Sequence, residues 1–168
     1  ISCKDRDNDD ALRTYLLGSV MGGILIQRDI LLLHANALEK AGKVIICAGE
    51  KGAGKSTVSY ILMSNGWRLL SDDLVAIDDN GIVLPGIPRI KLFKGVIEGL
   101  DLNINKFRHL YFHENKYVID RDNVNPSFEL KKISEIYFLE RNSKSNSKKI
   151  IEPIEVNSER KKLFCLKK

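Results

Sequence analysis

The chain has 168 residues, the length of one ordinary domain, and such a chain buries about two-thirds of its unfolded surface on folding. Hydrophobic residues make up 43% and charged residues 29% of the sequence, which excludes collagen-like and disordered classes. The net charge of +5 comes from residues 141–168, where basic side chains outnumber acidic ones by six. We predict one domain over residues 1–168, with a loose lead-in at 1–10 and a basic C-terminal segment at 141–168.

The elements follow from hydrophobic spacing and turn residues. In chain order they are a helix at residues 11–26, strands at 30–38 and 43–48, a helix at 55–64, strands at 68–70, 74–77, 82–84 and 89–93, a short helix at 94–100, strands at 116–119, 133–139 and 150–156, and a basic helix capped by Ser158. Tight turns are predicted at residues 40–43 and 78–81, and a polar loop at 141–149. Three glycines at positions 18, 22 and 23 would permit close packing of the first helix against a sheet. Many consecutive strands with few helices predict an α/β fold with a mixed or antiparallel sheet and flanking helices.

Three cysteines, Cys3, Cys47 and Cys165, lie far apart and show no CxxC spacing. This pattern fits neither a disulfide framework nor a zinc site and predicts a reducing, cytoplasmic compartment. The longest apolar run, at residues 15–26, is about half as long as a membrane span requires, so we expect no membrane association. The basic segment lacks the alternation of aromatic and basic residues that a nucleic-acid surface uses, which disfavours nucleic acid as a partner.

The strongest motif follows the strand predicted at residues 43–48. The stretch Gly49-Glu50-Lys51-Gly52-Ala53-Gly54-Lys55-Ser56 matches the phosphate-loop pattern GxxxxGK[ST], and Thr57 continues it into the predicted helix. Glycines let successive backbone N–H groups point at a polyphosphate, and the helix adds its positive N-terminal end. Lys55 would reach the β- and γ-phosphates, and the Ser56 hydroxyl would ligate magnesium. The alternative interpretation is a glycine turn before an ordinary helix.

Two adjacent carboxylates, Asp72 and Asp73, follow that helix and one short strand. Beside a polyphosphate loop they would repel each other and the ligand, and a metal ion or a shared proton would relieve this repulsion. One of them could hold magnesium while the other accepts a proton from a hydroxyl nucleophile. The alternative interpretation is a polar turn between strands.

Histidines supply two further candidates. His34 follows an apolar run, and pairing of its strand with residues 43–48 would bring it near the start of the loop, where it could hydrogen-bond an aspartate or a phosphate. A structural histidine fits the same pattern. His109 and His113 stand at i, i+4 spacing, which on a helix could bind a metal. A plain surface helix fits that spacing equally, and no third ligand lies near it in the sequence.

Two classes of phosphate-loop protein are excluded by their own motifs. A GTPase carries NKxD, from which Asn115-Lys116-Tyr117-Val118 departs at the fourth position, and an ABC-type ATPase carries LSGGQ, which is absent. A small kinase remains.

Together the motifs resemble the HPr kinase/phosphorylase family. The resemblance spans residues 10–93 and rests on His34-Ala35, the GxxxxGKS loop, Asn65-Gly66 and Leu69-Leu70-Ser71-Asp72-Asp73. It is closer still to shorter HPr-kinase-like proteins encoded with peptide natural-product systems, some of which phosphorylate a serine of a lasso-peptide precursor. The resemblance implies a fold related to the nucleotide-binding domain of phosphoenolpyruvate carboxykinase, with ATP and Mg²⁺ as cofactors and a serine-bearing peptide or protein as substrate. The glutamate–arginine–glycine-rich signature of bifunctional members is absent, and a homo-oligomer is left open.

Carried over to this sequence, the resemblance assigns a role to each candidate. Residues 49–56 would bind phosphates, Asp72 would be the base, and Asp73 would be the metal-linked carboxylate. His34 would lie beside the base and tune it. Arg89 and Lys91 fall where such relatives place basic residues near the active site, although Arg89 could equally be a charge at a strand edge.

Three other functions stay open. A small-molecule kinase resembling shikimate kinase also places aspartates after the helix of the phosphate loop, and it would have a parallel five-stranded sheet. A regulatory module could bind ATP without transferring phosphate. Nucleic-acid binding through the basic end would show strongly salt-dependent affinity.

Overall fold

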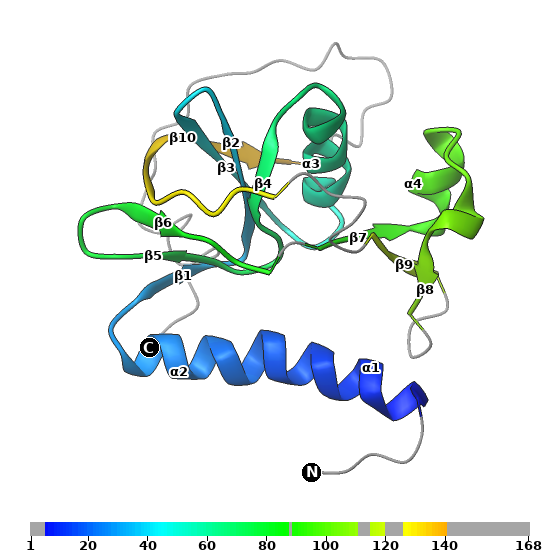
Figure 1. Ribbon diagram of the computed structural model, residues 1–168, viewed down its shortest axis with the longest axis horizontal. Helices are drawn as coiled ribbons and strands as arrows, with labels where there is room; N and C mark the ends of the chain where they lie inside the picture. Colours follow the sequence, from blue (N-terminus) through cyan, green and yellow to red (C-terminus); the bar gives the residue numbers. More distant parts are fainter. Residues whose placement is uncertain (1–5, 88, 111–114, 120–125, 141–168) are drawn as a thin grey trace.

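The computed structural model describes residues 6–87, 89–110, 115–119 and 126–140, which form two sheets with helices around them (Figure 1). The described helices are α1 (Arg6–Tyr15), the π-helical turn η1 (Leu16–Val20), α2 (Met21–Gln27), α3 (Lys55–Ser64), α4 (Lys94–Gly99) and the 3-10 turn η2 (Ile104–Lys106). The described strands are β1 (Leu31–Leu33), β2 (Ala35–Lys40), β3 (Lys43–Gly49), β4 (Arg68–Ser71), β5 (Val75–Ile77), β6 (Ile82–Leu84), β7 (Ile90–Phe93), β8 (Arg108–His109), β9 (Lys116–Ile119) and β10 (Lys131–Leu139).

Seven strands form the main sheet in the order β1-β5-β6-β10-β3-β2-β4. Its neighbours pair antiparallel except β10 and β3, which run parallel. A separate antiparallel sheet, β7-β9-β8, lies with α4 to the right of α3 in Figure 1 and is called the small sheet below. The predicted mixed, largely antiparallel sheet is therefore confirmed. The parallel five-stranded sheet of the small-molecule kinase alternative is not found among the described strands.

β3 is the central strand of the molecule because both of its faces are buried. Val44, Ile46 and Ala48 point into a core that draws members from all seven strands of the main sheet, so the sheet curls around it. Ile45 and Cys47 point the opposite way, into a second core shared with α3 and the small sheet. Alternate side chains on a strand face opposite ways, so the unbroken apolar run at residues 44–48 is what two cores require. The two cores therefore hold the end of β3 in place, and the loop that follows begins there.

Local signals placed several elements as predicted. Ala41 and Gly42 both have positive φ, 50° and 84°, as a two-residue hairpin turn between β2 and β3 requires. At the β5–β6 turn the Asp78 carboxylate accepts hydrogen bonds from the backbone N–H groups of Asn80 and Ile82. Of the three glycines predicted to pack against a sheet, Gly22 lies near the sheet, where an added Cβ would make ordinary contacts at 3.6 Å with Leu32 and 3.7 Å with Leu74, whereas Gly18 and Gly23 have nothing within 4 Å.

Three predictions need correction. Residues 6–10, predicted as part of the loose lead-in, already belong to α1. The single strand predicted at residues 30–38 bends at His34 into β1, which pairs with β5, and β2, which pairs with β3 and β4. His109 belongs to β8 rather than to a helix, because it pairs with Tyr117 across the small sheet.

Some predictions lie outside the described residues. These are the structure of His113, Cys3 and Cys165, residues 1–5 of the lead-in, and the loop, strand and Ser158-capped helix predicted within residues 141–168. Within the described part of the chain, no helix combines the length and the apolar character needed to cross a membrane.

Candidate functional site

The glycine-rich loop connects the end of β3 to the start of α3, as the motif predicts. Gly49, Gly52 and Gly54 take positive φ angles of 154°, 85° and 97°, which side chains disfavour. Gly49 must also lack a Cβ, because that atom would lie 2.5 Å from the carbonyl oxygen of Leu139 in β10. Gly54 is the N-cap of α3, so the unpaired N–H groups of the first helical turn face the loop. The geometry suits an anion.

Lys55, the first residue of α3, folds back across this loop. Only 7% of the residue is exposed, and its ammonium donates to the carbonyls of Gly49 at 2.8 Å and Glu50 at 3.0 Å. Burial lowers the pKa of this ammonium, and the charges of Asp73 and Asp72 oppose the shift. A buried cation fixed at the mouth of a glycine loop can neutralise phosphate oxygens as a point charge.

Asp72 lies beside the start of α3 and is short of hydrogen-bond donors. The Ser56 hydroxyl donates to its Oδ1 at 3.5 Å, and its Oδ2 is buried without a hydrogen-bond partner. Burial and the neighbouring Asp73 raise the pKa of Asp72 to about 7. A hydroxyl and a carboxylate with a buried free oxygen are ligands that Mg²⁺ prefers, and the cation would add to the positive charge that Lys91 and Arg89 already bring to Asp72. Ser56 and Asp72 therefore fit a magnesium ion.

In this candidate magnesium site the protein would not supply all of the metal ligands. Among the described residues, no group of three or more His, Cys, Asp or Glu side chains is close enough to hold a metal. Mg²⁺ in nucleotide sites commonly takes one or two protein ligands and completes its shell with phosphate oxygens and water. The donor set agrees with that mode of binding.

Asp73 faces a different set of partners. It forms an ion pair with Lys91 of β7, and 41% of its side chain is exposed against 15% for Lys91. Burial alone would raise the pKa of Asp73, but Lys91 and His34 hold it below its ordinary value. Its φ of 66° is supported by Asn36, whose side-chain oxygen accepts from the Asp73 N–H at 3.4 Å and whose NH₂ group donates to Ser59 of α3 at 2.9 Å. Asn36 was not predicted as a site residue, although a polar residue within a largely apolar stretch is a signal that the sequence shows.

His34 lies at the bend between β1 and β2, on the same side as Asp73. Partial burial of the ring lowers its pKa, Lys55 adds to this shift, and Asp73 opposes it. The imidazole is therefore neutral at pH 7. In the structure the carboxylate that acts on His34 is Asp73.

These elements enclose a pocket of about 150 Å³. It is lined by His34, Lys51, Gly52, Gly54, Lys55, Ser56, Thr57, Asp73, Lys91, Leu92, Phe93, Val96 and Lys116. Most of the predicted site residues thus come together. Gly49, Glu50 and Ala53 belong to the loop without lining the pocket, and Asp72 and Arg89 also lie outside the lining. The Arg89 charge does reach Asp72, whose pKa it lowers.

Lys116 is the charged residue of the pocket lining that the sequence did not predict. It lies on β9 directly opposite Phe93 of β7, and its ammonium is 4.8 Å from the centre of the Phe93 ring. In the sequence, Lys116 was considered only within Asn115-Lys116-Tyr117-Val118, which departs from the GTPase motif NKxD. Its position depends on the pairing of two strands that are distant in sequence, so no local signal marks it.

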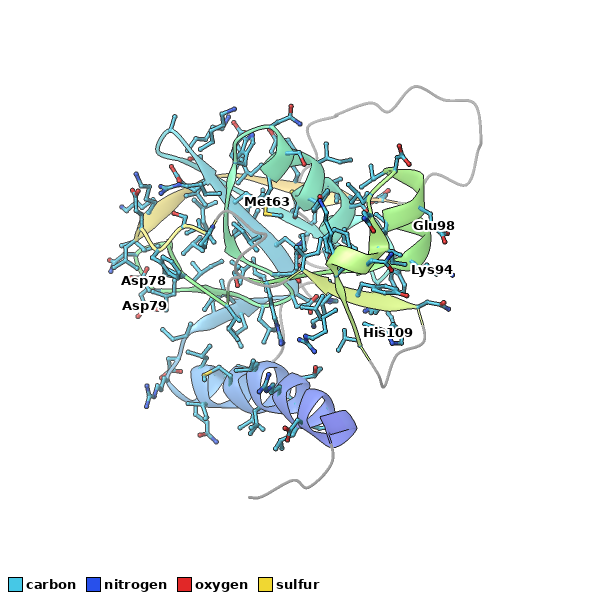
Figure 2. The ribbon with its side chains drawn as sticks, turned by 45° about the vertical axis from the view of Figure 1, so that its right-hand side comes forward. Met63, Asp78, Asp79, Lys94, Glu98 and His109 are labelled. Carbon is cyan, nitrogen blue, oxygen red and sulfur yellow. The ribbon has the colours of Figure 1, made fainter. Side chains whose placement is uncertain are left out.

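The candidate His109 and a second pair of adjacent aspartates, Asp78 and Asp79, do not line the pocket. Figure 2 shows Asp78 and Asp79 at the tip of the β5–β6 hairpin, on the opposite side of the molecule from His109 on the small sheet. The Asp78–Asp79 pair therefore serves its turn, whereas the Asp72–Asp73 pair borders the loop. His109 packs against Tyr117, with ring centres 5.0 Å apart.

Comparisons with known proteins support a distant relation to kinases. No family model matches the chain. Two curated proteins, each called HPr kinase/phosphorylase, are similar to it; they come from Clostridium botulinum strains Eklund 17B (Type B) and Alaska E43 (Type E3). Each is 32% identical over 80 residues, which cover 47% of this chain and 26% of the relative. The chain thus spans about a quarter of the length of the curated relatives that it matches.

Proposed function

We propose that the chain is an ATP-dependent, magnesium-assisted phosphotransferase that acts on a serine hydroxyl of a peptide or protein in the cytoplasm. The observation that carries this proposal is the convergence of the glycine loop, Lys55 and Asp73 at one cationic pocket, with Asp72 beside it in contact with Ser56. The name of the two curated relatives, HPr kinase/phosphorylase, supports the same class of reaction and a protein substrate. A lasso-peptide precursor as the acceptor stays a prediction from the resemblance, and a homo-oligomer stays open.

In this proposal the loop backbone and Lys55 hold the phosphate chain of ATP. Ser56 and Asp72 hold Mg²⁺, which when bound neutralises charge on the phosphate oxygens. The serine hydroxyl forms a new O–P bond to the γ-phosphorus, the bond between the γ-phosphorus and the bridging oxygen breaks, and ADP leaves. The hydroxyl proton passes to an aspartate.

The two aspartates differ in their fitness for that proton transfer. The sequence assigned the base to Asp72 and the metal to Asp73, and the pKa of about 7 for Asp72 suits a base. Position favours the reverse, because Asp73 lines the pocket whereas Asp72 contacts Ser56. A base must reach the proton that it abstracts, so we assign the base to Asp73 and the metal-linked carboxylate to Asp72.

Thermal unfolding of wild type and Lys55→Ala with and without Mg-ATP tests the binding step. A ligand at about 100 times its Kd stabilises a fold by about 2.7 kcal/mol, which raises the Tm of a domain of this size by about 5–11 °C. We expect this shift in wild type and its loss in the variant. No shift in wild type, or an equal shift in both proteins, would contradict the proposal. If ATP binds and no serine peptide is phosphorylated, the regulatory module becomes the better interpretation.

A further inference from the structure

The pocket holds more positive charge than the glycine loop supplies. Four lysines line it, Lys51 and Lys55 from the loop segment and Lys91 and Lys116 from the small sheet. Lys55 is bound to loop carbonyls and Lys91 to Asp73. Lys116, in contrast, forms no ion pair within 4.0 Å in the part of the chain that the structure describes.

Strand pairing explains why Lys116 points into the pocket. Lys91 pairs with Val118 and Phe93 with Lys116, and directly opposite residues of an antiparallel pair share one face. Lys91, Phe93 and Lys116 therefore project from the same face of the small sheet, and all three line the pocket. The alternate residues, among them Ile90, Leu92 and Ile119, fill the second core. Packing in the second core fixes the register between β7 and β9, and this register directs Lys91 and Lys116 into the pocket.

The charges around Lys116 identify the end of the pocket that it serves. Burial lowers the pKa of Lys116, Asp73 opposes this shift, and the charges of Lys91 and Lys51 add to it. Lys116 in turn acts on His34, Lys55 and Asp73. Lys116 therefore lines the same pocket as the loop lysine Lys55 and Asp73, and its charge reaches both of them. A phosphate group bound between the loop and the small sheet would lie within reach of its ammonium.

We propose that Lys116 binds the terminal phosphate of a nucleoside triphosphate and thereby makes the pocket prefer a triphosphate to a diphosphate. This inference rests on the proposed function and deepens it. The small sheet then takes part in binding through one ammonium, which Phe93 supports from below with its ring. No loop residue has to move for this contact, because Lys116 and Lys55 already line the same pocket.

Calorimetric titration of the whole chain with Mg-ATP and with Mg-ADP tests the inference. We expect Lys116→Met, which keeps the aliphatic stem but removes the charge, to bind Mg-ATP about tenfold more weakly, the loss expected for one charged hydrogen bond. Its affinity for Mg-ADP should stay within about twofold of wild type. Lys116→Arg should retain most of the preference for ATP. Lys106→Met is the matched control: Lys106 is an exposed lysine outside the pocket, and its loss should change neither affinity.

The outcomes separate this inference from the proposed function. If wild type prefers ATP and Lys116→Met binds both nucleotides as wild type does, or loses both equally, the role of Lys116 is wrong while the kinase proposal stands. If wild type binds neither nucleotide, or Lys55→Ala binds Mg-ATP as tightly as wild type, both proposals fail. Unfolding curves check that each variant folds, and Lys116→Gln supplies a second neutral side chain should the methionine variant not fold.

Discussion

The loop segment (residues 43–66) and the small sheet contribute to one pocket in opposite ways. In the loop segment the strand, the glycines, Lys55 and Ser56 are consecutive, and most of their anion-binding groups belong to the backbone. In the small sheet the contributing groups are side chains, Lys91 and Lys116, brought together by the pairing of β7 with β9. The loop segment can be predicted from sequence because its motif is local. In the small sheet the strands β7 and β9 can be predicted, but the pocket surface that they form cannot, because it depends on how they pair.

This difference has a consequence for how the pocket discriminates. Backbone N–H groups bind any phosphate chain of suitable length, so the loop gives affinity for phosphate in general. Side chains that reach in from another sheet can contact one particular phosphate or the acceptor. Substitutions in the small sheet or in the turn that holds Asp72 and Asp73, called the acidic turn below, should therefore alter specificity most easily. Substitutions in the loop segment should alter the affinity for phosphate in general.

The acidic turn gives the largest expected effect because it lies between the two regions. Asp72 contacts Ser56 of the loop segment, and Asp73 pairs with Lys91 of the small sheet. We expect Asp73→Asn to slow phosphoryl transfer by about 10²- to 10⁴-fold, the usual contribution of a general base, while Mg-ATP still binds. Single-turnover transfer from radiolabelled ATP to the acceptor peptide used for wild type measures this rate.

Asp72→Asn should act on the metal instead. We expect the Mg²⁺ concentration needed for half-maximal transfer to rise by about tenfold, since one charged ligand is lost. Asp79→Asn in the hairpin pair is the control and should change neither property. If Asp72→Asn slows transfer by about 10²-fold or more at an unchanged Mg²⁺ requirement and Asp73→Asn transfers normally, the roles inferred from the sequence are right and those inferred from position are wrong.

Substitution of Gly49 gives an effect of intermediate size. It tests whether β10, which is distant in sequence, constrains the glycine loop. An added Cβ would meet the Leu139 carbonyl oxygen at 2.5 Å and the Ala53 Cβ at 3.1 Å. We expect Gly49→Ala to lower the free energy of unfolding by about 2–3 kcal/mol, because β3 or β10 must shift. Urea denaturation measures the change. Gly23→Ala is the control: it lies in α2 with nothing within 4 Å and should stabilise by about 0.5–1 kcal/mol. If Gly49→Ala and Gly23→Ala change the free energy of unfolding equally, β10 does not constrain the loop.

Where the signals are local, the sequence predicts the structure closely. The bounds of α3, β6 and β9 match the predicted residues 55–64, 82–84 and 116–119. In each case a turn residue or cap stands next to an apolar run, so neighbouring residues alone decide where the element begins and ends. The glycine loop, Lys55, Ser56 and the acidic pair were predicted for the same reason.

Where tertiary pairing decides, the sequence was insufficient. No glycine or proline marks a bend near His34 in residues 30–38, and the bend arises because β1 and β2 pair with different strands. His109 fits helical spacing, yet its backbone pairs with β9. Lys116 enters the pocket only through its register with Phe93. Each of these outcomes depends on residues far away in sequence, which no window of neighbouring residues contains.

Substitution of Phe93 gives the smallest expected effect. It tests most directly what the small sheet, in contrast to the loop segment, contributes to binding. The Lys116 ammonium lies over its ring, and a cation–π contact at an exposed site contributes about 0.5–1 kcal/mol. We expect Phe93→Leu to keep the apolar packing but to weaken Mg-ATP binding about two- to fivefold, with little change for Mg-ADP. Because this effect acts through Lys116, Phe93→Leu should add little in a chain that already carries Lys116→Met, and a double-mutant cycle by calorimetry measures that coupling. Additive losses would show instead that Phe93 contacts the nucleotide itself, independently of the lysine that it faces across the small sheet.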